Sequence, residues 1–237
     1  MAEGEAIPSV WTRPRRKEQV LSRERIVAEA VRLLDADGIE ALSMRTLGTR
    51  LGAAATSLYR HVANKDELIE LVVDDVYGEL EVPEARDPAA WRAAAGAAGH
   101  SLRAMILRHP WMTSVLGQSG LAYLGPNMMR VNERLLAVFE TAGFALEERD
   151  QAMSTFIAYV LGMSTSEAAF LSALARSGKD ERAWVESLWP AAERAAQEHT
   201  RLREGYALMR DQDPRQARDD TFDYGVERVL DGLATRL

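Results

Sequence analysis

The chain has 237 residues and a formal net charge of −7, from 29 Lys and Arg against 36 Asp and Glu. It contains no Cys, which excludes disulfides and thiolate metal sites. No apolar signal segment opens the chain, and its longest charge-free stretch, residues 110–129, is interrupted by glycines and a proline, so we expect a soluble, cytoplasmic protein without a membrane span.

The charge is unevenly distributed along the chain. Residues 12–65 carry 11 basic and 6 acidic side chains, a net of +5, while the remainder carries 18 basic and 30 acidic side chains, a net of −12. A basic N-terminal quarter on an acidic body favours a polyanionic partner for the first part only. A solvated charge fluctuation would give the same count, so charge alone does not decide between the two.

Helix signals begin after residue 20. Residues 1–20 contain two prolines and the basic run 15–17, which predicts a flexible basic arm. Ser22 is a candidate N-cap and Gly38 a helix stop, and a capping box of Asn64 and Glu67 opens a later helix. The predicted helices of this region are 22–37, 44–51, 54–61 and about 65–80.

Two short helices about the turn at Gly52, packed on a longer one, are typical of a helix-turn-helix. In the second short helix Leu58 and Val62 point inward. The outer positions then fall to Thr56, Ser57, Tyr59, Arg60 and His61. Hydroxyl, guanidinium and imidazole groups there could contact phosphates and base edges, and Lys65 suits a backbone phosphate. A solvated surface helix is the other interpretation of this spacing.

The rest of the chain also predicts helices. Asp87-Pro88 opens one that ends near His109, Gly125-Pro126 opens one that ends at Gly143, and a long one covers about 147–175. Pro190 is expected to kink or restart a further helix, and the last one ends the chain. Strand-type alternation does not persist anywhere, so we expect an all-α protein of about nine or ten helices.

The segments "GIEALSMRTLGTRLG" and "SLYRHVANKDEL" resemble the DNA-binding domain of the tetracycline-repressor (TetR) family. Later segments, among them "LRAMILRHPWM" and "AYVLGMSTSEAAF", resemble that family's tetracycline-repressor-type C-terminal domain. The resemblance implies a helix-turn-helix domain at 21–67 and a ligand-binding and dimerisation domain at 68–237. It also implies that Ser43 and Arg45 contact phosphates or bases and that Lys65 contacts a phosphate.

The family pairs its long and last helices with those of a second subunit, which implies a homodimer. The candidate interface residues are Phe156, Val160, Ser164, Leu171, Phe222, Val226, Val229 and Leu233. Ordinary packing within one chain would use the same residues, and that interpretation stays open.

A mostly apolar pocket for a small organic effector is expected near the charge-free segments. Its candidate lining residues are Trp111, Met112, Tyr123, Asn127, Met128, Phe156, Tyr159 and Met163. Taken singly, each of them is better explained as a core residue, and it is mainly the family resemblance that implies a pocket for the group. The stretch comparable to the family's metal-binding helix, residues 112–126, has no His, so we expect neither a metal nor another cofactor.

These observations predict a ligand-responsive transcriptional regulator, a homodimeric repressor that binds a palindromic operator, lies on the nucleoid when bound, and is released by a small organic effector. Two alternatives remain. One is an all-α enzyme with an incidental helix-turn-helix, although G-x-S-x-G, H-E-x-x-H, Walker and G-x-G-x-x-G motifs are all absent from the sequence. The other is a DNA-binding activator without a ligand.

Overall fold

The structure, a computed structural model, describes residues 21–116 and 124–237. Across these residues it has eleven α-helices and two short 3-10 turns and no strand, which confirms the all-α prediction, although the expected number of about nine or ten helices was too low. The predicted arm of residues 1–20 and the candidate pocket residue Tyr123 lie outside the described residues.

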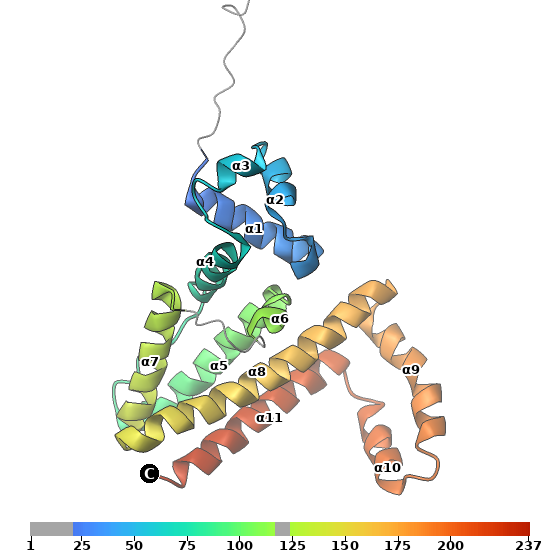
Figure 1. Cartoon of the computed structure of the whole chain (residues 1–237). Helices are drawn as coiled ribbons and strands as arrows, with labels where there is room; N and C mark the ends of the chain where they lie inside the picture. Colours follow the sequence, from blue (N-terminus) through green and yellow to red (C-terminus); the bar gives the residue numbers. More distant parts are fainter. Residues whose placement is uncertain (1–20, 117–123) are drawn as a thin grey trace, which may run out of the picture.

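An N-terminal lobe (residues 21–62) stands on one end of the molecule, and α4 runs from it into a larger C-terminal body (residues 80–237) (Figure 1). The lobe contains α1 (Arg23–Asp37), the 3-10 turn η1 (Ile39–Ala41), α2 (Met44–Leu51) and α3 (Ala55–Leu58), and α4 spans Lys65–Tyr77. Side-chain caps start three of these helices. Ser22 accepts from the N–H of Arg25, and Asn64 accepts from the N–H of Glu67, as predicted from the sequence.

Helix α3 is shorter than the expected 54–61. It ends at Leu58, and the N–H groups of His61 and Val62 both bond to the carbonyl of Leu58, at 2.9 and 3.1 Å. This shared acceptor closes the helix as a turn. Tyr59, Arg60 and His61 therefore lie in the turn that follows α3.

The C-terminal body is built around four long helices. Its elements are η2 (Pro88–Ala90), α5 (Trp91–Arg108), α6 (Met112–Leu116), α7 (Pro126–Ala142), α8 (Leu146–Ser177), α9 (Glu181–Ala195), α10 (Thr200–Met209) and α11 (Pro214–Ala234). Helices α8 and α11 run side by side, and α5 and α7 pack against α8 (Figure 1). Phe139, Phe156 and Phe222 are fully buried between these helices and form the centre of the core.

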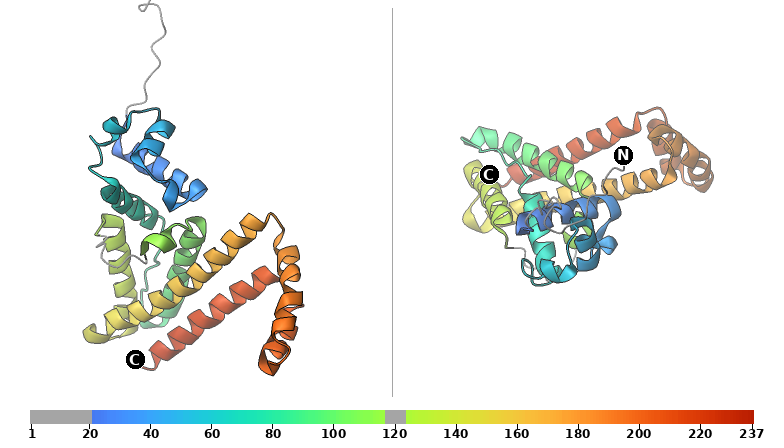
Figure 2. Two further views of the ribbon diagram at one scale, coloured as in Figure 1. Left: turned by 45° about the vertical axis from the view of Figure 1, so that its right-hand side comes forward. Right: turned by 90° about the horizontal axis from the view of Figure 1, so that it is seen from above.

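Helices α9 and α10 form a hairpin (residues 181–209) that hangs from the far ends of α8 and α11 (Figures 1 and 2). Pro190 lies inside α9 without ending it, and neither helix of the hairpin contains a buried residue. Trp184 packs edge-on against Phe170 of α8, with ring centroids 4.9 Å apart. Leu188 and Leu208 are exposed, so much of the hairpin's apolar surface is uncovered in the single chain.

Helix α8 is, within the described residues, the one helix long and apolar enough to cross a membrane by length and composition. One such helix is weak grounds for a membrane span. Only 17% of its most apolar window is buried inside the protein, so a weakly charged helix face remains on the outside of the chain.

Candidate nucleic-acid interface and effector site

The predicted DNA-contacting side chains lie on the surface of the N-terminal lobe. Leu58 and Val62 are 0% and 1% exposed, while Tyr59 between them is 51% exposed. The other seven candidates are likewise exposed or half-exposed: Ser43, Arg45, Thr56, Ser57, Arg60, His61 and Lys65. The inward anchors and outward polar groups of the sequence pattern are therefore separated as a DNA-contacting element requires.

Local hydrogen bonds hold the backbone around these side chains. The hydroxyl of Ser43 caps α2 by accepting from the N–H of Thr46 at 3.0 Å, a structural task beside its predicted contact with DNA. The carboxylate of Glu67 accepts from the N–H of Ala63 at 2.6 Å, next to the Asn64 cap. Lys65 is the first residue of α4, where an ammonium group and the positive helix end would both attract a phosphate.

The predicted effector residues do not line one cavity. Trp111 and Met112 are buried, and Phe156 lies in the core. Asn127 and Met128, in the first turn of α7, bond to Asp74 of α4, and Tyr159 donates its hydroxyl to the carbonyl of Phe222 at 3.1 Å. Met163 lines a separate cavity farther along α8. Burial, with the nearby Asp223 carboxylate, raises the pKa of the Tyr159 phenol, which therefore stays a neutral donor.

A small cavity of about 120 Å³ lies between α4, α5, α7 and α8. Its lining is mostly apolar and includes Tyr77, Leu80, Leu102, Leu135, Met153 and Ile157. Tyr77 is the last residue of α4, so this cavity directly adjoins the helix that leads to the N-terminal lobe.

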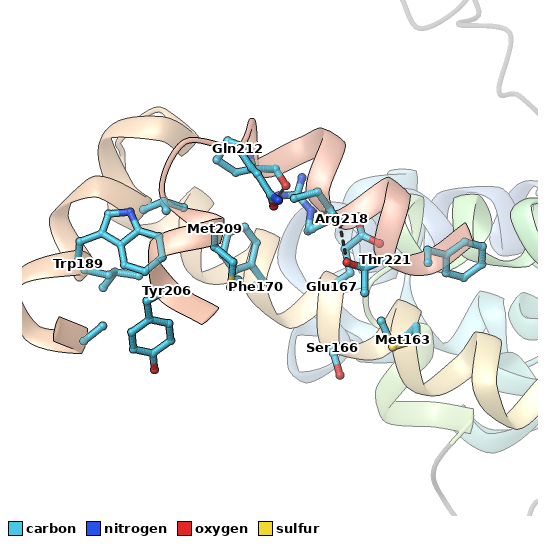
Figure 3. A pocket seen from close by; sticks show the side chains of 16 residues that line it. Met163, Ser166, Glu167, Phe170, Trp189, Tyr206, Met209, Gln212, Arg218 and Thr221 are labelled. Carbon is cyan, nitrogen blue, oxygen red and sulfur yellow. Dashed lines mark hydrogen bonds and ion pairs between the residues drawn. The ribbon is translucent and has the colours of Figure 1, made fainter. Parts of the chain in front are cut away.

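A larger cavity of about 480 Å³ lies between α8, α11 and the α9–α10 hairpin (Figure 3). Trp189 and Tyr206 lie at its hairpin end, Phe170 and Met209 lie in the middle, and the paired Glu167 and Arg218 lie towards the body. Met163 is the one effector candidate among the described residues that lines this cavity. The sequence analysis missed its other walls because they depend on how the successive helices α8 to α11 pack on one another. The aromatic residues of the amphipathic α9 and α10 were the available signal.

A network of ion pairs joins this cavity to α5. Arg103, almost fully buried, donates to both oxygens of Glu167 at 2.7 and 2.8 Å and to Asp219 of α11 at 2.6 Å. Arg218 pairs with the same Glu167 and with Glu181 at the start of α9. The hydrogen bonds that the Arg103 guanidinium donates to Glu167 and Asp219 hold its pKa above the usual value, so this buried charge is permanent.

Helix α7 is capped by a residue of α4. Gly125, which precedes α7, offers no side-chain cap, and the carboxylate of Asp74 instead accepts from the N–H groups of Asn127 and Met128 at 2.9 and 3.0 Å. The amide of Asn127 donates back to the carbonyl of Asp74 at 3.1 Å. A Cβ at position 125 would lie 2.2 Å from the Asp74 carboxyl group, so the close approach requires glycine.

Asp74→Ala is expected to lower the free energy of unfolding by about 1–2 kcal/mol, because α7 loses its N-terminal acceptor and α4 loses its polar link to α7. Urea denaturation followed by circular dichroism measures this change. Glu70→Ala, at an exposed position of the same helix, is the control and should change stability by less than about 0.5 kcal/mol. Equal effects of the two substitutions would contradict the cap.

The candidate dimer residues are mostly covered within one chain. Phe156, Val160, Ser164, Phe222 and Val226 are buried in the core, and Leu171, Val229 and Leu233 are half-buried. Their packing within the chain is thus observed, and contact across subunits stays a prediction. The exposed stripe of α8 lies on the opposite side and consists of small uncharged residues: Thr155, Ala158, Gly162, Thr165 and Ala169.

Comparison with known proteins assigns the chain to a family. Residues 26–72 match the family "Bacterial regulatory proteins, tetR family", and residues 83–237 match "Tetracyclin repressor-like, C-terminal domain". The chain belongs to the TetR family of transcriptional regulators. The two matched ranges fall on the N-terminal lobe with α4 and on the C-terminal body, so the resemblance of both parts is confirmed.

This TetR-family chain has relatives of nearly its full length. It is 33% identical over 232 residues to an HTH-type transcriptional regulator of Saccharopolyspora erythraea, covering 95% of this chain and 91% of the relative. It is 32% identical over 231 residues to the HTH-type transcriptional repressor DrrR1 of Streptomyces coeruleorubidus, covering 94% and 83%.

Among solved structures, the TetR-family protein ActR of Streptomyces coelicolor in complex with actinorhodin has a TM-score of 0.74 and 30% identity, covering 91% of this chain and 96% of ActR.

Proposed function

We propose that this protein is a ligand-responsive transcriptional repressor, a homodimer that binds a palindromic operator and leaves it when a small organic effector binds. The observation that carries the proposal is the surface of the N-terminal lobe. Eight polar or basic side chains lie exposed or half-exposed around α2, α3 and the start of α4, while Leu58 and Val62 anchor the element inside. The repressor DrrR1 and the actinorhodin complex of ActR support the repressor and the ligand parts of the proposal.

The outer faces of α8 and α11 support the homodimer. The small residues of the α8 stripe allow close approach of a second helix, and α11 presents Tyr224, 66% exposed, beside Arg228. The uncovered apolar side of the α9–α10 hairpin, which forms one wall of the 480 Å³ cavity, is further surface for the second subunit to cover. A two-fold dimer would supply two recognition elements about 34–36 Å apart, as a palindrome requires.

We assign the effector to the 120 Å³ cavity between α4, α5, α7 and α8. Its 120 Å³ is less than the roughly 300–1,000 Å³ of ordinary small-molecule sites, so these helices must separate to admit a ligand. A ligand that fits only the separated arrangement stabilises it, and α4 moves with it. A ligand in this cavity would contact Tyr77 and Leu80 directly, so its binding would act on α4 and through α4 on the N-terminal lobe.

The remaining parts of the proposal follow from this role. A regulator of this kind acts on chromosomal DNA, which places it in the cytoplasm and on the nucleoid when it is bound. Catalytic activity has no part in the proposed mechanism, which needs only binding equilibria at two sites.

Titration of the purified chain onto a labelled fragment of its own upstream intergenic DNA tests the proposal. We expect tight binding whose affinity falls steeply as salt rises, because Arg and Lys side chains displace counterions from phosphates. Footprinting should show two half-sites about one helical turn apart, or a multiple of it. Binding no tighter than to random DNA of equal length, on this fragment and after selection from random sequences, would contradict the proposal.

A further inference from the structure

The N-terminal lobe touches the C-terminal body at a second place besides α4. Asp35, near the end of α1, accepts hydrogen bonds at one carboxylate oxygen from Nδ1 of His109 at 2.7 Å and from Nε1 of Trp111 at 2.8 Å. These partners are 74 and 76 residues away and lie between α5 and α6. His109 is 3% exposed and Trp111 is 5% exposed, so the two donors are shielded from water, while Asp35 itself lies at the surface.

The backbone of His109 connects two helices of the body. Its N–H bonds to the carbonyl of Met105 at the end of α5, and its carbonyl accepts from the N–H of Met112 at the start of α6, both at 2.9 Å. Pro110 follows and keeps His109 out of helical geometry, which turns its ring and that of Trp111 towards α1. The two rings also pack edge-on, with centroids 6.1 Å apart.

The second ring nitrogen of His109 ties the same contact to the segment after α4. Nε2 lies 3.2 Å from the carboxylate of Glu79, which also pairs with Arg108. Each ring nitrogen of His109 therefore faces a carboxylate oxygen. The buried ring of His109 thereby lies between Asp35 of the N-terminal lobe and Glu79 of the body and joins the two parts.

We propose that the contact of Asp35 with His109 and Trp111 fixes the orientation of the N-terminal lobe on the body and thereby makes the protein selective for the spacing of operator half-sites. A lobe held by α4 alone can turn about that helix, whereas a second attachment at the end of α1 removes this freedom. The inference rests on the proposed function.

Spacing is the property that a fixed lobe controls. Inserting one base pair between the half-sites increases their separation by about 3.4 Å and rotates one half-site relative to the other about the DNA axis. Rigid lobes cannot follow this change, so the intact protein should discriminate strongly. Freed lobes can follow it, but they lose conformational entropy on any operator and bind even the native one more weakly.

The test compares variants of the full chain on three DNA fragments: the operator found in its upstream region, and that operator with one base pair added or removed between the half-sites. For Asp35→Asn we expect about tenfold weaker binding to the native operator, and a severalfold smaller loss of affinity when the spacing changes. Trp111→Phe keeps an aromatic ring at this position and loses one hydrogen-bond donor. It should change the operator affinity and the spacing penalty in the same direction as Asp35→Asn, but by smaller amounts.

Asp37→Asn is the matched control. It removes an acidic charge two residues away on α1, but Asp37 pairs with Arg50 of α2, inside the N-terminal lobe. Both substitutions change the net charge equally, so weaker binding by Asp35→Asn alone reflects the contact with the body.

The outcomes separate the two proposals. If wild-type protein binds the operator and both Asp35→Asn and Trp111→Phe match Asp37→Asn in affinity and spacing ratio, the role of the Asp35 contact is wrong while the proposed function stands. If wild-type protein binds no operator DNA, the proposed function fails and this inference fails with it. Should Asp35→Asn not fold, as judged by circular dichroism, Trp111→Phe decides.

Discussion

Simultaneous replacement of Arg60 and Lys65 by alanine is expected to weaken operator binding roughly a thousandfold at moderate salt. A dimer loses four cationic contacts, and about 1 kcal/mol for each gives about 4 kcal/mol, or nearly three factors of ten. Both side chains are exposed, so the fold should be unaffected. Fluorescence anisotropy with labelled operator measures the affinity.

The salt dependence of binding distinguishes the contribution of Lys65 from that of Arg60. Lys65→Ala alone should reduce the slope of log affinity against log salt by about two for a dimer, because it removes one phosphate contact in each subunit. Arg60→Ala should reduce discrimination between operator and random DNA if the guanidinium contacts a base, since base contacts carry specificity.

Lys179→Ala/Arg182→Ala is the matched control for the Arg60 and Lys65 pair. It removes two exposed positive charges at the end of α8 and the start of α9, outside the N-terminal lobe. The control should bind operator DNA almost as tightly as the wild type. An equal loss in both double variants would mean that long-range charge, rather than the predicted surface, governs binding.

Ala158→Asp is expected to raise the dimer dissociation constant at least about a hundredfold. Ala158 lies in the exposed small-residue stripe of α8, and a two-fold contact there would bring two carboxylates together in a desolvated interface. Like charges so placed cost several kcal/mol. Operator binding should fall with the dimer, because a single subunit supplies one recognition element.

Analytical ultracentrifugation over a range of concentrations measures this constant. Ala137→Asp, at an exposed position of α7, introduces the same charge away from α8 and α11 and should remain as dimeric as the wild type. A dimeric Ala158→Asp variant would place the subunit contact on another face. A monomeric wild type would remove the basis for a palindromic operator.

Local sequence signals predicted the elements well. The caps at Ser22 and Asn64 and the glycine stops at Gly38 and Gly143 fix helix ends through bonds that span three or four residues, and such bonds leave a mark in the sequence. The end of α3 was predicted too late because the composition of residues 59–61 is compatible with a helix. In the structure α4 begins soon afterwards, at the Asn64 cap, and the intervening residues form the turn between the two helices.

The contacts between distant segments were not predictable in this way. Nothing in the pattern around Asp35 indicates a partner at His109, and Asp74 gives no sign that it caps a helix 53 residues later. Such pairings depend on how α1, α4, α5 and α7 meet in space. For the same reason the sequence did not distinguish effector-binding residues from core residues, since a charge-free segment is typical of a core and of a pocket alike.

The cap that Asp74 provides for α7 should make substitutions at positions 74 and 125 depend on each other during evolution. A side chain at position 125 would collide with the Asp74 carboxylate, and a shorter residue at position 74 would leave the start of α7 without its acceptor. Either change alone is therefore unfavourable, whereas the two together replace the Asp74 cap by a different start of α7. Among homologous chains, glycine at position 125 should accompany an acidic residue at position 74, and larger residues at 125 should appear where that carboxylate has been lost.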